Sequence, residues 1–216
     1  MNITGEEHRH LVVARAEKGE EIEVFDGRGN VWVVAVESLE KRGAIARVID
    51  SRQAPRPEVE IILALAMIRN AAFELALEKV VEIGVTRIVP FTAARSNVGR
   101  GARHDRWHRI VVEAAKQSKR YHLPALDEPA AFSEVIEIPA ASKIMFAEGS
   151  SGSLKSALRG SPILYLIGPE GGWTDSELAD AREHGFQAVT LGEGILKAET
   201  AAIVGGSLIR YEICGK

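Results

Sequence analysis

The chain has 216 residues, of which 46% are hydrophobic and 26% charged, a composition typical of a globular protein with room for one large and one small domain. Its longest apolar run, Ile61 to Ile68, is far shorter than the roughly 20 residues that cross a bilayer. The first residues lack the basic and apolar regions of a secretory signal, so we expect a cytoplasmic protein with no membrane partner. Cys214 is the single cysteine, which excludes an internal disulfide and a cysteine-ligated site, and we expect no metal.

The net charge is −3, but the charges are unevenly distributed. Residues 93–124, the basic segment, contain eight Arg or Lys and two acids, so this segment carries +6 and the rest of the chain −9. A basic stripe in an acidic protein is typical of a surface that contacts nucleic-acid phosphates. A solvated helix face is the alternative, and composition does not decide between them. The histidines of this segment lack metal-ligand spacing.

The first part of the chain has the pattern of a small β-rich domain. Acidic and apolar residues alternate over 20–25, and after a glycine-containing turn an apolar run covers 31–36, which together predict a β-hairpin. A third strand is expected over 44–49. The segment 51–57 is polar with two prolines and reads as a linker. We therefore predict a small domain over residues 1–52.

The pattern changes after this linker, because short apolar runs now alternate with helical patterns. The runs that predict strands cover 61–66, 86–91, 143–147, 163–167 and 187–191. The helical patterns cover 71–83, 105–119 and 175–184. Strands that alternate with helices over short connections predict an α/β domain with a mainly parallel sheet, covered on both faces, over residues 58–216.

Helix boundaries carry the strongest local signals in this domain. Gly84 follows the helix over 71–83 as a C-terminal glycine, and Gly185 ends the helix over 175–184 in the same way. Thr174 and Glu177 have the spacing of a capping box. The helix over 105–119 should bury one face and leave its basic residues on the others; the residues of the buried face are Trp107, Ile110, Val111, Ala114 and Ala115.

Ligands of parallel sheets bind beyond the carboxyl ends of the strands, and the expected strands lead into glycine-rich loops there. These loops are 147–149, 168–172 and 191–200, and their glycines let the backbone approach a ligand closely. The phosphate-binding motifs of ATP and dinucleotide proteins are absent, so those alternatives lose their main support. Glu170 and Glu199 could act as paired carboxylates or could simply lie at helix N-termini, where a negative charge is favoured.

The glycine-rich strings identify a family. Ile167-Gly168-Pro169-Glu170-Gly171-Gly172-Trp173-Thr174, then Leu191-Gly192, then the string from Ile195 to Ala202, resemble the ribosomal small subunit methyltransferase E family of the SPOUT superfamily. Further segments agree with it: Glu78-Lys79, Glu82 to Val85, Arg95-Ser96, Glu113 to Ala115, Gln117-Ser118 and Arg120, with His10-Leu11, Arg15, Gly19 and Val24 to Gly27 near the start. The resemblance covers nearly the whole chain.

This resemblance implies a parallel-sheet SPOUT methyltransferase domain with a C-terminal trefoil knot, preceded by a small PUA-like β-barrel. The family usually begins with a further basic, aromatic strand before the first residue of this chain, so we expect a shortened barrel. The implied reaction is S-adenosylmethionine-dependent N3-methylation of one uridine in the decoding region of 16S ribosomal RNA. The implied partners are 16S ribosomal RNA or the small ribosomal subunit, and a second copy of the chain in a homodimer.

The resemblance also places the site. We expect S-adenosylmethionine between the 168–172 and 191–198 loops, in contact with Glu148, Ile167, Gly168, Glu170, Gly172, Leu191, Gly192, Ile195, Leu196, Ala198 and Thr200. Glu199 is the expected general base, and Lys197, or alternatively Arg95, would stabilise negative charge on a uracil oxygen. The expected RNA-binding residues are Arg15, Arg28, Arg103, Arg106, Lys119 and Arg120.

Some positions depart from the family pattern. Gly194 and Lys197 stand where the family usually has arginine, and Ile68-Arg69-Asn70 stands where a Lys-Gly-Asp-Arg-like string is common. An alternative function is therefore an RNA-binding SPOUT relative with weak or no catalytic activity, and a generic α/β enzyme that uses another nucleotide is a third. Gly205 and Gly206 in the last helix, expected over 199–211, would let a helix of a second copy approach closely; packing against the chain's own sheet is the other reading.

Overall fold

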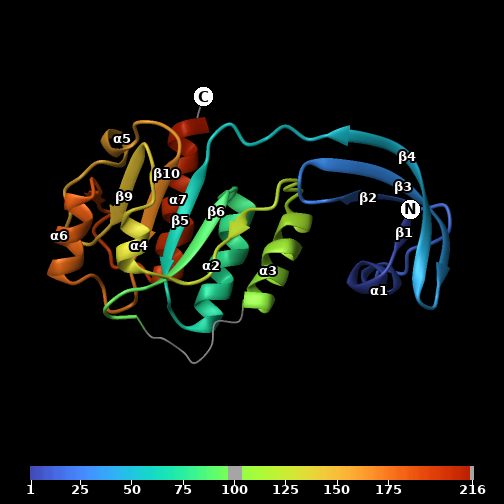
Figure 1. Ribbon diagram of the computed structural model, residues 1–216, viewed down its shortest axis with the longest axis horizontal. Helices are drawn as coiled ribbons and strands as arrows, with labels where there is room; N and C mark the ends of the chain where they lie inside the picture. Colours follow the sequence, from blue (N-terminus) through green and yellow to red (C-terminus); the bar gives the residue numbers. More distant parts are fainter. Residues whose placement is uncertain (97–103, 215–216) are drawn as a thin grey trace. The chain divides into compact units, whose positions relative to one another are not determined.

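The computed structural model describes residues 1–96 and 104–214 and divides into two compact units, Met1–Arg56 and Pro57–Lys216 (Figure 1). Arg103, one of the expected RNA-binding residues, lies outside the described residues. No helix of the described part is long and apolar enough to span a membrane. Within the same residues, no cluster of histidine, cysteine and acidic side chains could hold a metal ion.

The first unit is a four-stranded antiparallel sheet in the order β1-β4-β3-β2. Its elements are β1 (Asn2–Ile3), α1 (Gly5–Val13), β2 (Glu21–Phe25), β3 (Asn30–Glu40) and β4 (Gly43–Gln53). The predicted hairpin and third strand are confirmed as β2, β3 and β4. The linker prediction was wrong at its start, because Asn30 pairs with Gln53 and thereby extends β4 into it. Helix α1 was not predicted; few of its residues are apolar, and they cluster at its end.

The expected RNA-binding residues of this unit are both exposed. Arg15 follows α1 in a left-handed conformation, with φ of 56°. Arg28 lies in the β2–β3 turn, where its backbone N–H donates to the Asp26 carboxylate over 2.7 Å. The Asn30 side chain and backbone N–H groups of the turn hold the pKa of Asp26 below its usual range. Asp26 thus fixes the turn that carries Arg28.

The second unit is built on a parallel sheet in the order β11-β9-β10-β5-β6-β7, with β8 paired to β6. Its strands are β5 (Ile61–Ala66), β6 (Arg87–Thr92), β7 (Ala125–Leu126), β8 (Ala130–Ala131), β9 (Ser142–Phe146), β10 (Ile163–Ile167) and β11 (Gln187–Val189). All strands predicted for this domain are present, and among the described residues only the two-residue strands β7 and β8 were missed. The predicted parallel α/β sheet is confirmed.

Helices cover both faces of this sheet (Figure 1). Helices α2 (Asn70–Ile83), α3 (His104–Gln117) and α7 (Ala198–Cys214) pack on one face, and α4 (Phe132–Ile136) and α6 (Asp175–Glu183) on the other; α5 (Leu154–Ala157) is a single turn. Side chains of β5 alternate between the two faces, so Leu63 joins the first core and Ala64 the second. Because both faces are buried, β5 is apolar at every position.

The predicted terminal glycines and the predicted capping box are confirmed. Gly84 adopts the left-handed conformation, with φ of 99°, as the C-cap of α2, and Gly185 follows α6 with φ of 85°. The Glu177 backbone N–H donates to the Thr174 hydroxyl, as a capping box requires. Of the predicted buried face of α3, only Ile110 is partly rather than fully buried. Helix α3 ends before residue 119, its predicted limit, because Lys119 has φ of 54°.

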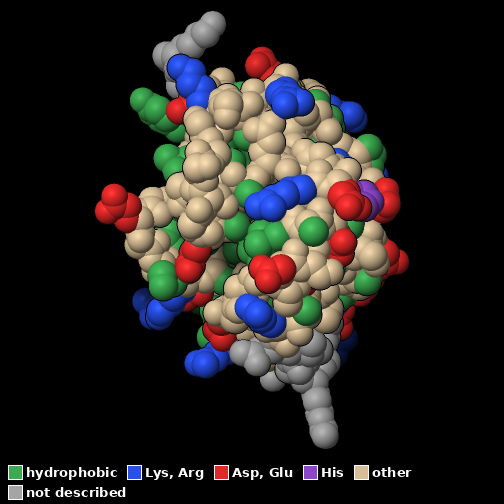
Figure 2. All heavy atoms as spheres, turned by 90° about the vertical axis from the view of Figure 1, so that its left-hand side faces the viewer, with side chains coloured by type: hydrophobic (Ala, Val, Ile, Leu, Met, Phe, Trp, Pro, Cys, Tyr) green, Lys and Arg blue, Asp and Glu red, His purple; other side chains and the backbone are tan. Residues whose placement is uncertain are grey.

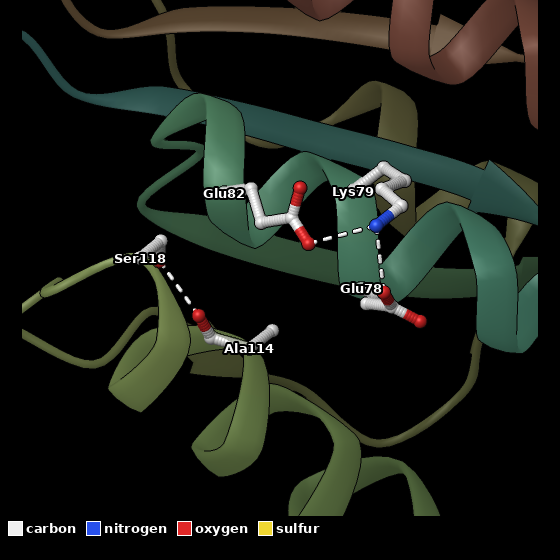
Figure 3. A network of polar contacts seen from close by, with 5 residues as sticks. All are labelled: Glu78, Lys79, Glu82, Ala114 and Ser118. Carbon is white, nitrogen blue, oxygen red and sulfur yellow. Dashed lines mark hydrogen bonds and ion pairs between the residues drawn. The ribbon is translucent and has the colours of Figure 1, made fainter.

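Polar side chains near the ends of α2 and α3 are engaged within their own helices (Figure 3). Lys79 donates to Glu78 over 2.7 Å and to Glu82 over 2.9 Å, and these carboxylates raise the pKa of Lys79. The Ser118 hydroxyl donates to the Ala114 carbonyl over 2.6 Å. Glu78, Lys79, Glu82 and Ser118, which belong to segments that resemble the family, therefore make hydrogen bonds within or next to their own helices.

The glycines of α7 face the chain's own sheet, which corrects the reading that they receive a second copy. A Cβ atom added to Gly205 would lie 2.7 Å from Cε2 of Phe146, and one added to Gly206 would lie 2.8 Å from the Tyr165 hydroxyl oxygen. The Tyr165 hydroxyl donates to the Ala202 carbonyl of α7 over 3.2 Å, and burial raises its pKa. The glycines thus serve close packing of α7 on β9 and β10.

We predict that Gly205→Ala destabilises the protein by about 1–3 kcal/mol, because the new methyl group overpacks the contact with Phe146. Alanine is the better helix former, so helix propensity alone predicts the opposite sign. Ser207→Ala, at an exposed position of the same helix, is the matched control and should change stability little. Urea unfolding of the variants measures both effects. Equal or greater stability of Gly205→Ala would contradict the packing role.

Candidate active site

A cavity of about 1110 Å³ lies at the carboxyl edge of the parallel sheet. Strands β11, β9 and β10 are neighbours, so the loops that follow them meet there. All but one of the expected cofactor-binding and catalytic residues line it: Glu148, Ile167, Gly168, Glu170, Gly172, Leu191, Gly192, Ile195, Leu196 and Ala198, with Arg95, Lys197 and Glu199. The exception is Thr200, which is not a lining residue. Thr200 lies in the first turn of α7, between Glu199 and Ala201, which both line the cavity.

The loop of residues 168–173 forms one wall of the cavity. The side chain of its last residue, Trp173, holds this loop in place. The indole N–H of Trp173 donates to the Phe146 carbonyl, at the end of β9, over 2.9 Å. Its ring stacks on Phe91, with ring centres 6.1 Å apart. A Cβ atom at Gly168 would lie only 2.8 Å from the indole. Gly168 is therefore required for packing against Trp173, whatever else it contacts.

Arg95 ties the 168–173 loop to the end of β6. Its Nη1 donates to the Gly171 carbonyl over 3.0 Å and to the Trp173 carbonyl over 3.2 Å. A Cβ atom at Gly171 would lie 3.0 Å from Cβ of Arg95, so the glycine leaves room for the arginine stem. The loop shape therefore depends on a side chain from a distant part of the sequence.

The third loop, between β11 and α7, is open to solvent. The Thr190 hydroxyl donates to the Gly192 carbonyl over 2.8 Å and accepts from the Gly192 backbone N–H, which closes a tight turn. Gly192 has φ of 126°, a conformation that suits glycine alone. Ile195 is 81% exposed although it is apolar. An exposed apolar side chain on the rim of a cavity is suited to contact a ligand.

The candidate catalytic residues lie where this loop enters α7. Lys197 is exposed, and its carbonyl accepts the Ala201 N–H at the start of the helix. Glu199 is half-buried in the first turn of α7 and lines the cavity. Its charge there is also favoured by the helix dipole, so geometry is compatible with both the catalytic and the structural reading.

Arg69 was not among the expected site residues, although it lines the cavity. It stands immediately before α2, and its Nε lies 3.5 Å from a carboxylate oxygen of Glu170. Glu170 lies before α6, which starts at Asp175, so the helix-terminus interpretation is wrong for this residue, and its charge has a cationic neighbour in Arg69. The only sequence signal was the departure of Ile68-Arg69-Asn70 from the family string.

Some side chains of the basic segment bind to other parts of the protein. Arg106 pairs with Glu74 of α2, which raises the pKa of the arginine. Arg120 donates to the Glu82 carbonyl over 2.8 Å and thereby caps α2, and burial, followed by the charge of Arg210, lowers its pKa. Lys119 is exposed. Arg120 is therefore fixed to the protein, whereas Lys119 projects into solvent.

Figure 2 shows the end of the second unit that carries α6. Acidic and basic side chains are interspersed on this face, with apolar side chains near its centre. His184, at the end of α6, pairs with Glu137 over 3.0 Å, and the carbonyl of Asp180 together with Glu137 raises the pKa of His184. Such a mixed face lacks the one-signed charge of a phosphate-binding surface.

Comparison with known proteins decides the family. Residues 55–210 match the model of an RNA methyltransferase domain, and residues 3–49 match that of an RNA methyltransferase PUA domain. The chain belongs to the ribosomal RNA small subunit methyltransferase E family. It is thus an RNA methyltransferase with an N-terminal PUA-like domain and a SPOUT-type α/β domain.

Members of this family are similar over most of their length. The Synechocystis enzyme of this name is 34% identical over 93% of this chain and 69% of its own, and the Bacillus subtilis enzyme is 29% identical over 98% and 90%. The Neisseria gonorrhoeae enzyme, solved bound to S-adenosylmethionine, has a TM-score of 0.90 and 31% identity, with 97% of this chain and 90% of that chain covered. A Legionella pneumophila protein, solved with the same cofactor bound, has a TM-score of 0.91, 27% identity and the same coverage.

We predict that Gly168→Ala weakens cofactor binding at least tenfold, because the new methyl group displaces Trp173 and with it the cavity wall. Isothermal titration with S-adenosylmethionine measures the affinity. Gly194→Ala is the control for folding, since a Cβ atom there meets nothing within 4 Å and the melting temperature should not change. An unchanged affinity in Gly168→Ala would show that the wall does not depend on this packing.

Proposed function

We propose that the protein transfers a methyl group from S-adenosylmethionine to N3 of one uridine in the decoding region of 16S ribosomal RNA. The observation that supports this most strongly is the cavity, which combines the glycine-rich loops of a SPOUT cofactor site with Lys197 and Glu199 on one rim. Family membership supplies the substrate class, and the solved relatives that bind S-adenosylmethionine support the cofactor.

The residues of the cavity fit this cofactor. The cavity volume of about 1110 Å³ leaves room for a nucleoside together with an acceptor base. Cβ atoms at Gly192 and Gly194 would meet nothing within 4 Å, so the backbone there is accessible to the edge of a ligand. Leu191, Ile195 and Leu196 would contact its apolar parts. We propose contacts from all the expected cofactor-binding residues that line the cavity, and none from Thr200.

The chemistry sets two requirements. When bound, S-adenosylmethionine supplies an electrophilic methyl carbon on a sulfonium, so the protein must mainly align the reactants and remove a proton. The N3 atom of uracil carries a proton at neutral pH, and its electron pair attacks carbon only once that proton leaves. We propose that the Glu199 carboxylate takes this proton. Lys197 then stabilises the negative charge that develops on a uracil oxygen, and Arg95 holds the loop opposite.

The RNA must present an unstacked base, because N3 lies on the Watson–Crick edge. We propose that Arg15, Arg28 and Lys119, which are exposed, contact phosphates, and that Arg106 adds to them beside its pair with Glu74. The partner is 16S ribosomal RNA or the assembled small subunit, and the protein acts in the cytoplasm. A homodimer and the C-terminal trefoil knot stay predictions from the family.

A second candidate function is RNA binding with weak catalysis. The observation that favours it is Gly194, which lines the cavity without a side chain at a position where the family usually has arginine. Under this alternative the protein binds RNA and cofactor but transfers the methyl group slowly. A turnover measurement separates the two functions.

We predict that Glu199→Gln lowers the methylation rate about 100-fold or more, since it removes the base while it keeps the size of the side chain. Raising the pH should partly restore the rate, because hydroxide then removes the N3 proton. The assay uses 16S RNA and cofactor with a labelled methyl group, followed by nucleoside analysis for N3-methyluridine. Glu193→Gln is the control, because Glu193 is exposed in the same loop and does not line the cavity. A Glu199→Gln variant with near wild-type rate would rule out the base.

Substitutions at Lys119 and at Arg120 should affect different properties, RNA binding in the first case and stability in the second. We predict that Lys119→Gln lowers RNA affinity and reduces the slope of log affinity against log salt by about 0.7–0.9, with unchanged melting temperature. Arg120→Met should instead destabilise the protein by about 1 kcal/mol, because it removes the cap of α2. Filter binding at several salt concentrations and thermal unfolding measure the two effects. The reverse pattern would contradict the assignment.

A further inference from the structure

Glu177 is a buried carboxylate beside the candidate active site, and it is more than a helix cap. The residue is 6% exposed. One carboxylate oxygen accepts from the backbone N–H and the hydroxyl of Thr174, over 2.9 and 3.0 Å. These bonds complete the capping box of α6. The other oxygen accepts from the Ala94 backbone N–H over 2.8 Å, and a capping box does not require this bond.

The bond to Ala94 joins two loops that the sheet keeps apart. Ala94 follows β6 and Thr174 follows β10, and β5 lies between these strands in the sheet. Arg95, the next residue after Ala94, reaches back across the same gap to the carbonyls of Gly171 and Trp173. Glu177 therefore holds the backbone from which Arg95 projects, and Arg95 holds the cavity wall.

A buried carboxylate is costly to desolvate unless its oxygens receive hydrogen bonds. Glu177 meets this condition only when the Ala94 loop, Thr174 and α6 are all in place. The arrangement therefore favours one relative position of the loops over any displaced one. A misplacement of about 1 Å at a reacting centre can lower a rate by about 100-fold, so such a link matters for methyl transfer.

We infer that Glu177 is a positioning residue for methyl transfer, which acts through Ala94 and Arg95 to fix the 168–173 wall of the cavity. The inference rests on the proposed function, because it assumes that the transfer takes place in this cavity. Glu177 contacts neither substrate nor cofactor in this account. Its effect is therefore expected on turnover and on loop order, and not on the affinity for RNA.

Glu177→Asp tests the inference. The shorter side chain keeps the negative charge at the N-terminus of α6 but no longer spans both Thr174 and Ala94. We expect kcat to fall about 10- to 100-fold at saturating RNA and cofactor, with the KM for RNA changed less than twofold. Glu134→Asp is the matched control: Glu134 accepts the Ala131 backbone N–H over 2.7 Å at the start of α4 and does not line the cavity. Its kcat should stay at the wild-type value.

A double-mutant cycle identifies the route of the effect. If Glu177 acts through Arg95, Glu177→Asp combined with Arg95→Ala should be no slower than Arg95→Ala alone. Multiplied losses in the double variant, or a wild-type kcat in Glu177→Asp, would overturn the inference.

Hydrogen exchange tests the inference without a measurement of methylation activity. In the free protein, Glu177→Asp should speed the exchange of amides in the 168–173 loop, whereas Glu134→Asp should not. If the aspartate variant does not fold, the isosteric Glu177→Gln replaces it with the same expected results. Absence of methylation by the wild-type protein would refute the proposed function, and unchanged exchange in the 168–173 loop would refute the positioning role.

Discussion

The backbone of the 168–173 loop has no strand partner, and the site depends on the side chains that satisfy its polar groups. Arg95 donates to the carbonyls of Gly171 and Trp173, and Glu177 accepts from the Thr174 N–H. Trp173 in turn donates to the carbonyl that ends β9. A loop without such partners would be mobile, because each unpaired polar group would turn to water. The wall of the cavity that the 168–173 loop forms is therefore held in place by side-chain hydrogen bonds.

The glycines near this wall have two physical uses, and the structure separates them. Gly168 and Gly205 allow aromatic rings to approach the backbone, so a side chain at either position would disturb the core. Gly192 and Gly194 lie in open space on the solvent side of the cavity. The wall formed by the 168–173 loop thus lies in the same cavity as a loop whose glycine backbone is accessible.

Local features could be predicted from the sequence, because their partners lie a few residues away. The capping box of Thr174 and Glu177 and the terminal Gly84 are of this kind. The roles of Gly205 and Arg120 could not be, since Phe146 and Glu82 are distant in the chain and only the fold brings them together. The cavity-lining residues were found largely through family resemblance, which also explains why those without a family motif, such as Arg69, were missed.

A crystal structure of the protein grown with S-adenosylmethionine tests the central claim most directly. The account predicts density for the whole cofactor between the 168–172 and 191–198 loops, with the hydrogen bonds of Arg95 and Trp173 to the wall preserved. It also predicts that the methyl group points toward the rim that carries Lys197 and Glu199. Cofactor bound elsewhere, or a wall rebuilt so that Arg95 leaves the Gly171 and Trp173 carbonyls, would contradict it.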